Sequence, residues 1–303
     1  MINKLIVGLL PYLPKKFVWI FSKRYIAGKE LKDALNVTRK LNSQRIKATM
    51  DLLGEFLTRA ENIEYYKNEY LRLIEESVKA GLDNSFSVKP TMFGLLLDQE
   101  RCYTSIREIV AKASSHDRFI RIDMEDTQCT DMEIHLYKRL LDEFPHHVGL
   151  VLQSYLKRTL DDLKDLVAFD RGRGLINIRL CKGIYNEPAE MAFKDREEIN
   201  QNFLIDLEYM FRNNIYAAIA THDRKLIKGS YRLIEACHVP EDKFEFQMLY
   251  GVTPDLRQSI VEKGYTMRVY VPYGKDWFNY STRRLKENPR MALHIIKAIF
   301  VQG

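Results

Sequence analysis

The chain of 303 residues is 46% hydrophobic and 29% charged, values typical of a folded globular protein that exclude a disordered chain. Its formal charge of +6 favours a phosphate-bearing ligand or an anionic membrane surface over a cationic partner. The four cysteines form no CxxC pair and the seven histidines are scattered. We therefore predict no metal site, no disulfide framework and a reducing cytoplasmic location.

The first segment of the chain is apolar and basic. Prolines and lysines interrupt its apolar runs before they reach the length of a transmembrane helix, and no small-residue cleavage site follows, so we predict neither a membrane span nor a secretion signal. Two helices are expected, over residues 14–24 and 29–44. The aromatic and lysine residues around Trp19 suit an amphipathic helix in a membrane interface, and they suit equally a helix packed on its own domain.

Beyond residue 46, short β-rich runs alternate with segments of helical length and period. This alternation indicates parallel strands joined through helices, and nearly continuous apolar runs such as YAAIA suit strands buried on both faces. Eight such units favour a closed (β/α)8 TIM barrel over an open doubly wound sheet, and no GxGxxG motif follows the first strand. The β-rich runs begin at Lys47, Phe86, Arg118, His147, Gly174, Asn214, Lys243 and Tyr265.

One domain is predicted for the whole chain. A chain of this length could hold two ordinary domains, but single barrels also reach it, and no linker or low-complexity stretch divides the sequence. The expected α/β catalytic domain, 1–303, comprises N-terminal helices over 1–45, the barrel over 46–290 and a C-terminal helix over 291–303.

The predicted strands end in side chains that carry charge or donate hydrogen bonds. In TIM barrels the chemistry lies at the carboxyl ends of the strands, so we expect a site there. Each residue also has an ordinary explanation: Asp123 could cap the next turn, and Gln153 could satisfy a buried backbone group. The strand-end residues are Lys89, Asp123, Glu125, Gln153, Arg179, Lys182, Thr221, His222, Gln247 and Tyr270.

The segment NIRLCKGIYNEP, residues 177–188, places two cations beside a glycine. Arg179 and Lys182 suit a phosphate or an electron-rich ring, and Gly183 allows the backbone to approach a ligand closely. A solvated loop explains the same residues, so the segment alone does not decide between them.

The segment YSTRRLKENP, residues 280–289, pairs two arginines on a predicted helix. Tyr280, Arg284 and Glu287 share one face at i, i+4 and i+7, so Glu287 can orient Arg284. A guanidinium fork suits a carboxylate because it makes two parallel charge-assisted bonds. A solvated face and a phosphate clamp are the alternatives for Arg283 and Arg284.

Eight motifs in matching order resemble the proline dehydrogenases, in their single-function bacterial form without a fused aldehyde dehydrogenase. The likeness spans roughly Lys47 to Pro289. The motifs are VKP (88–90), IDMED (122–126), LVLQSYLKR (150–158), IRLCKGIY (178–185), ATHD (220–223), FEFQMLYG (244–251), RVYVPYG (268–274) and YSTRRLKEN (280–288).

The resemblance implies oxidation of L-proline to 1-pyrroline-5-carboxylate in a distorted barrel whose last helix lies over the barrel mouth. It implies that Arg283 and Arg284 bind the proline carboxylate and that Lys89 pairs with it. Asp123 would belong to the polar network that links Lys89 to the substrate and cofactor. The resemblance also assigns the ring walls to Leu249, Tyr270 and Tyr280, and the brace of Arg284 to Glu287.

The cofactor implied by the resemblance is FAD, with Arg179 near the reactive flavin nitrogen, hydride transfer to flavin N5 and electrons passed to a membrane quinone. A cytoplasmic enzyme that contacts the inner face of the cell membrane, without a nucleic-acid partner, is expected. The positions that match FAD-binding residues are Gln153, Arg179, Lys182, Gly183, Ile184, Tyr185, Thr221, His222, Asp223 and Gln247.

Three positions depart from the usual family pattern. Cys181 and Ile184 stand in RLCKGIY where the family commonly has RLVKGAY, and Asp223 replaces the usual asparagine after the ATH triplet. Ile184 could narrow the pocket or shift the flavin, so a diverged paralogue acting on another cyclic or secondary amino acid is one alternative. A barrel enzyme that uses a phosphorylated substrate without flavin is another, and a basic protein binding membranes or nucleic acid is a third.

Overall fold

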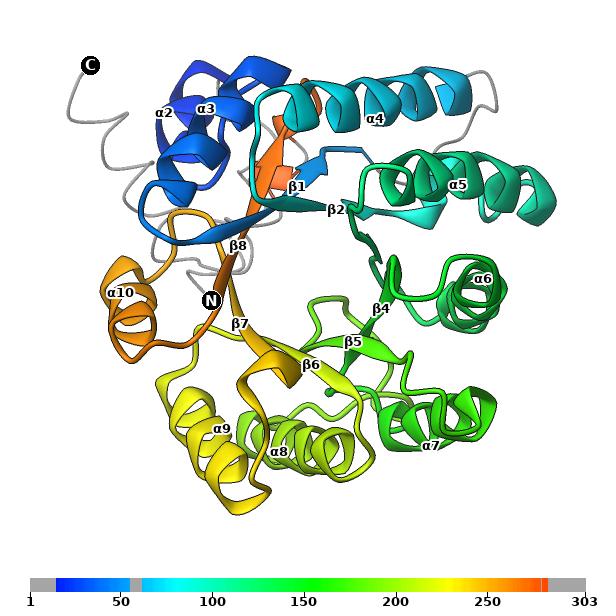
Figure 1. Ribbon diagram of the computed structural model, residues 1–303, viewed down its shortest axis with the longest axis vertical. Coiled ribbons are helices and arrows are strands. Elements are labelled where there is room, and N and C mark those ends of the chain that lie inside the picture. Colours follow the sequence, from blue (N-terminus) through cyan, green and yellow to red (C-terminus); the bar gives the residue numbers. More distant parts are fainter. Residues whose placement is uncertain (1–14, 55–61, 279, 283–303) are drawn as a thin grey trace.

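The strands close into a parallel barrel in which β8 hydrogen-bonds back to β1 (Figure 1). The computed structural model describes residues 15–54, 62–278 and 280–282. The predicted strands and the predicted closed barrel are confirmed. The strands are β1 (Lys47–Leu52), β2 (Asn84–Val88), β3 (Ile120–Ile122), β4 (Val148–Gln153), β5 (Asn177–Cys181), β6 (Tyr216–Ala220), β7 (Phe244–Leu249) and β8 (Met267–Tyr273).

Helices surround the barrel, as expected from the alternating pattern (Figure 1). In the described connections lie two short 3-10 helices, η2 (Pro90–Phe93) and η3 (Glu241–Lys243). The α-helices that follow the strands are α4 (Asn62–Lys79), α5 (Gln99–Ser114), α6 (Thr130–Glu143), α7 (Thr159–Asp170), α8 (Arg196–Arg212), α9 (Arg224–Ala236) and α10 (Pro254–Glu262).

Among the described residues, two helices precede the barrel, α2 (Lys15–Ser22) and α3 (Leu31–Asn42), and both were predicted. Helix α3 packs on the outside of β1 and β8, where the helix that follows β8 would lie in a regular barrel (Figure 1). Helix α2 packs on its own domain, since Val18 is fully buried. The helix after β8 is described at residues 277–278 and 280–282; its continuation and the predicted C-terminal helix over 291–303 lie outside the described residues.

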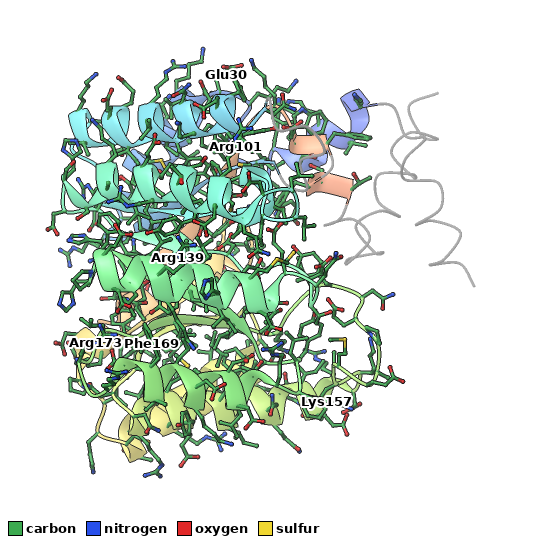
Figure 2. The ribbon with its side chains drawn as sticks, turned by 90° about the vertical axis from the view of Figure 1, so that its right-hand side faces the viewer. Glu30, Arg101, Arg139, Lys157, Phe169 and Arg173 are labelled. Atoms are coloured by element: carbon green, nitrogen blue, oxygen red, sulfur yellow. The ribbon has the colours of Figure 1, made fainter. Side chains whose placement is uncertain are left out.

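Neighbouring helices are joined by ion pairs on the outer face of the barrel. Arg139 Nη2 on α6 lies 2.9 Å from Glu100 Oε2 on α5, and Arg173 Nη1, after α7, lies 2.8 Å from Asp142 Oδ1 on α6. Figure 2 shows Arg139 and Arg173 on this face, with Arg173 beside Phe169. Exposed pairs of this kind contribute at most about 1 kcal/mol each, so the fold depends on the packed interior.

The barrel interior is polar at the amino-terminal ends of its strands. Arg121 on β3 is almost completely buried, and its Nη1 donates to the carbonyl oxygens of Leu150 (3.1 Å) and Asn177 (2.8 Å). A Cβ at position 149 would stand 2.4 Å from Arg121 Nη1, so Gly149 makes the room that this guanidinium occupies. Burial and then the nearby Arg179 lower the pKa of Arg121 to about 9.

A buried carboxylate on α8, Asp206, makes stability depend on pH. Its side chain is fully buried, its only hydrogen bond among the described residues comes from Asn202 Nδ2 at 3.3 Å, and burial raises its pKa to about 7. Because the folded state holds this proton more tightly than the unfolded chain, its contribution to stability is present below about pH 4 and is lost as the pH rises to about 7.

We expect Asp206→Asn to remove this pH-dependent loss. The loss amounts to at most about 4 kcal/mol. In urea unfolding at pH 5 and at pH 8, we compare the free energy of unfolding of the variant with that of the natural protein. The difference should favour the variant more at pH 8 than at pH 5. Asp161→Asn, which changes an exposed carboxylate paired with Lys164, is the control and should show no such gain. An equal difference at both pH values for Asp206→Asn would contradict the prediction.

Candidate active site

A cavity of about 650 Å³ lies at the carboxyl ends of the barrel strands. It gathers side chains from seven of the strands and their following loops, as the strand-end pattern predicted. Arg283, Arg284 and Glu287 lie outside the described residues. The predicted site residues that line the cavity are Lys89, Asp123, Gln153, Arg179, Lys182, Gly183, Ile184, Tyr185, Thr221, His222, Asp223, Gln247, Leu249, Tyr270 and Tyr280.

Asp123, just after β3, is the centre of the polar network in this cavity. Its Oδ1 accepts from Arg179 Nη1 at 2.8 Å and from Ser87 Oγ at 3.0 Å, and its Oδ2 accepts from Tyr270 Oη at 2.8 Å. These partners come from β2, β5 and β8, so one carboxylate fixes side chains across the width of the barrel. Asp123 is therefore more than the cap of a turn.

Lys89, directly after β2, is held as a partly buried cation. Its Nζ lies 2.5 Å from Asp51 Oδ1, 3.3 Å from Tyr270 Oη and 3.8 Å from Asp123 Oδ2. Burial alone would lower the pKa of Lys89, but the carboxylates of Asp51 and Asp123 outweigh burial and raise it. Asp51 on β1 was not predicted; the signal in the sequence was an acidic residue inside the apolar run KATMDLL.

A second chain of contacts holds Arg179 from the interior of the barrel. Arg179 Nε donates to Gln247 Oε1 at 2.6 Å, and Gln247 Nε2 donates to Glu245 Oε1 at 2.6 Å. Glu245 in turn accepts from Arg268 Nε at 2.8 Å. Glu245 and Arg268 were also missed, although each stands two residues before a predicted site residue on the same strand and so faces the same interior.

Asp223 holds two cations at the edge of the cavity. Its Oδ2 accepts from Lys182 Nζ at 2.8 Å and from Arg196 Nη2 at 2.9 Å, and its Oδ1 caps α9 by accepting from the Lys225 backbone N–H at 2.9 Å. Burial would raise the pKa of Asp223, but the bonds from Lys182 and Arg196 prevail and hold it well below its usual range. Asp223, which stands where the family usually has asparagine, therefore stays ionised, and two cations balance its charge. Arg196, at the start of α8, was not predicted.

Two further predicted residues are held by the backbone. His222 Nε2 accepts from the Leu249 backbone N–H at 2.8 Å, which joins the loop after β6 to the end of β7. Gln153 Nε2 donates to the carbonyl oxygens of Met124 (3.2 Å) and Glu125 (2.8 Å), so Gln153 does satisfy backbone groups, which was the alternative to a role in the site. Its Oε1 is buried without a hydrogen-bond partner among the described residues, and the residue lines the cavity.

The loop after β5 brings backbone close to the cavity. Gly183 has φ +103°, and a Cβ there would stand 2.1 Å from the ring of Tyr155. Ile184, next along the loop, lines the cavity and is half exposed, with 51% of its surface accessible. Only glycine fits beside Tyr155, whereas the predicted close approach of this backbone to a ligand stays a prediction.

Glu125 is a buried acid in the cavity wall. Its Oε2 accepts from the Thr91 backbone N–H at 2.9 Å and its Oε1 from Thr91 Oγ1 at 2.5 Å, while its own backbone N–H donates to Glu133 Oε1 at 3.1 Å. Burial raises the pKa of Glu125 to about 7, although the bonds from Thr91 oppose the rise. This residue ties the loop after β3 to η2 and α6.

A family model described as "Proline dehydrogenase" matches residues 34–294, which include the whole barrel and the cavity. The chain belongs to the proline dehydrogenase family. A proline dehydrogenase of Deinococcus radiodurans is 35% identical over 95% of this chain and 92% of its own length. Proline dehydrogenase 1 of Bacillus subtilis subsp. natto is 36% identical over 92% of this chain and 90% of its own length. The predicted family membership is therefore confirmed.

Two solved structures share the barrel fold. The crystal structure of proline utilization A (PutA) from Bdellovibrio bacteriovorus inactivated by N-propargylglycine has a TM-score of 0.82 and 25% identity, and it covers 88% of this chain. A PutA mutant of Bradyrhizobium japonicum gives a TM-score of 0.75 at 20% identity. This chain spans about a third of each of those longer chains, whereas it matches the single proline dehydrogenases over about nine-tenths of their length.

The described helices bear on whether the protein spans a membrane. Within the described residues, none of the helices is both long and apolar enough to cross a membrane. Contact of α2 with a membrane surface stays a prediction.

Proposed function

We propose that this protein oxidises L-proline to 1-pyrroline-5-carboxylate, with FAD as the hydride acceptor and a membrane quinone as the final electron acceptor. The proposal rests above all on the network in which Asp123 joins Lys89, Arg179 and Tyr270 in the lining of the cavity. Membership of the proline dehydrogenase family supports the reaction. We further propose that 1–303 form one catalytic domain that works on the cytoplasmic side of the membrane.

The residues of the cavity suit a flavin. When bound, FAD supplies the electron-accepting ring that takes a hydride from the carbon next to the proline nitrogen. Arg179, fixed by Asp123 and Gln247, presents a cation that favours an electron-rich reduced ring. The Oε1 of Gln153, which has no hydrogen-bond partner in the described part of the chain, offers an acceptor, and Gly183 allows close approach of the backbone. FAD would be held by these residues together with Lys182, Ile184, Tyr185, Thr221, His222, Asp223 and Gln247.

The substrate would lie between Lys89 and the aromatic residues of the cavity. Lys89 stays charged because Asp51 and Asp123 flank it, so it can pair with a carboxylate. Leu249, Tyr270 and Tyr280 line the same cavity and suit the walls of an apolar pyrrolidine ring. To complete this arrangement, we propose that Arg283 and Arg284 bind the carboxylate and that Glu287 orients Arg284. These three residues lie outside the described part of the chain.

An anaerobic titration tests the proposal. We expect the purified protein to be yellow with close to one flavin per chain, and L-proline to bleach the flavin absorbance. Colourless protein that cannot be reconstituted with FAD would overturn it. Bleaching by another cyclic or secondary amino acid at much lower concentration than by L-proline would point instead to a diverged substrate, for which the exposed side chain of Ile184 in the cavity is the natural determinant.

A further inference from the structure

The two tryptophans of the chain pack against each other although they lie at opposite ends of the described sequence. Trp19 belongs to α2, and Trp277 opens the helical turn after β8. Their ring centroids are 4.7 Å apart with the planes inclined at 62°, an edge-to-face pair. The N-terminal helix is thereby attached to the turn that follows the last strand.

Lys29 completes this contact as a cation shared by both rings. Its Nζ lies 4.8 Å from the ring centroid of Trp19 and 5.4 Å from that of Trp277. Both distances fall within the range in which a cation is attracted to an aromatic face. We call Trp19, Lys29 and Trp277 the tryptophan clamp.

The backbone around Lys29 is fixed to the end of β8. The Ala27 N–H donates to the Pro272 carbonyl oxygen at 2.9 Å, and the Gly274 N–H donates to the Gly28 carbonyl oxygen at 3.1 Å. The Lys29 N–H donates to Asp33 Oδ2 at 3.1 Å in the first turn of α3. The cation of the clamp therefore projects from an anchored segment.

The turn that the clamp holds carries a wall of the cavity. Trp277 is buried, and Ser281 Oγ donates a hydrogen bond to the Trp277 carbonyl oxygen at 2.7 Å, which supports the helical turn. Tyr280, three residues after Trp277 on this turn, lines the cavity. Neither Trp19 nor Lys29 is among the described residues that line it. The clamp thus reaches the site only through the helical turn.

We infer that Trp19 and Lys29 are positioning residues, which hold the turn described at 277–278 and 280–282 so that Tyr280 closes one side of the substrate pocket. This inference rests on the proposed function for its substrate, L-proline. Without the clamp, the turn would occupy its binding position only part of the time. A site that is competent for a fraction of the time binds substrate more weakly by that fraction, while the step after binding proceeds as before.

The kinetic test uses Trp19→Ala and Lys29→Ala in the flavin-loaded full chain. We expect KM for L-proline to rise about tenfold, in the range of a lost cation–π contact, with kcat within twofold of the natural protein. Trp19→Phe keeps an aromatic ring and should restore most of the affinity. Lys32→Ala removes an exposed lysine of the neighbouring turn and should leave KM unchanged. A rise in KM for Lys32→Ala equal to that for Lys29→Ala would overturn the inference.

A second measurement is independent of the substrate. Hydrogen–deuterium exchange of the amides of Trp277, Phe278 and residues 280–282 should accelerate in Trp19→Ala and Lys29→Ala but not in Lys32→Ala. Unchanged exchange, or faster exchange with unchanged KM, would overturn the positioning role. If exchange is faster in the two variants but the natural protein itself fails to oxidise proline, the clamp is supported and the proposed function is rejected.

Discussion

Asp123→Ala is expected to cost about 3–5 kcal/mol of stability and to lower kcat/KM for L-proline by at least about 100-fold. The carboxylate accepts from Arg179, Ser87 and Tyr270 and lies 3.8 Å from Lys89 Nζ. Without it, Arg179 loses its buried counter-charge. Urea unfolding and steady-state kinetics on the flavin-loaded protein measure the two effects.

Two further variants separate charge from general damage. Asp123→Asn keeps the shape but removes the charge, so it should retain more stability than Asp123→Ala while still losing most of the activity. Asp142→Ala removes a carboxylate that pairs with Arg173 on the outer surface, and it should cost no more than about 1 kcal/mol and leave activity intact. Activity near the natural level in Asp123→Asn would exclude a role for its charge.

The second large effect is expected for Gly183→Ala, which should abolish stoichiometric flavin binding. An added Cβ would lie 2.1 Å from the ring of Tyr155, itself 94% buried, and the φ of +103° is one that side chains rarely adopt. The loop after β5 must therefore move away from the position at which it lines the cavity. Flavin absorbance per chain and FAD affinity of the reconstituted protein measure the loss.

Gly172→Ala is the matched control because Gly172 also has a positive φ, but a Cβ there would collide with no neighbour. Gly172 has φ +79°, and nothing lies within 4 Å of an added Cβ. This variant should lose about 1–2 kcal/mol of stability and keep its flavin. If Gly183→Ala also retained a full complement of flavin, close approach of the backbone at this loop would not be needed for cofactor binding.

Local patterns in the sequence were sufficient to predict the barrel and most of the cavity. Parallel strands must end at the same rim, so Lys89, Asp123 and Tyr270 could be placed together without knowledge of their contacts. Their partners were harder to foresee. Asp51 meets Lys89 only because β1 and β2 are neighbours in the closed barrel, and Arg196 reaches Asp223 from the start of another helix.

The residues that were missed share a physical reason. Glu245 is buried and Arg268 is partly buried, and at both positions a sequence pattern shows only that a charge interrupts an apolar strand. Which opposite charge neutralises it depends on the inward direction of both side chains and on the strand register. The resemblance to a family supplied the identity of the reaction, which composition and periodicity did not.

The placement of α3 has a consequence for dissecting this protein into fragments. Leu31, Ala34 and Leu41 of that helix are buried, and the helix covers the outer side of the seam where β1 meets β8. A fragment that began at Lys47 would retain every strand but would expose an apolar stripe along the seam. Such a fragment should aggregate, so the smallest autonomous folding unit starts ahead of Leu31, and a split-protein design should avoid separating α3 from the barrel.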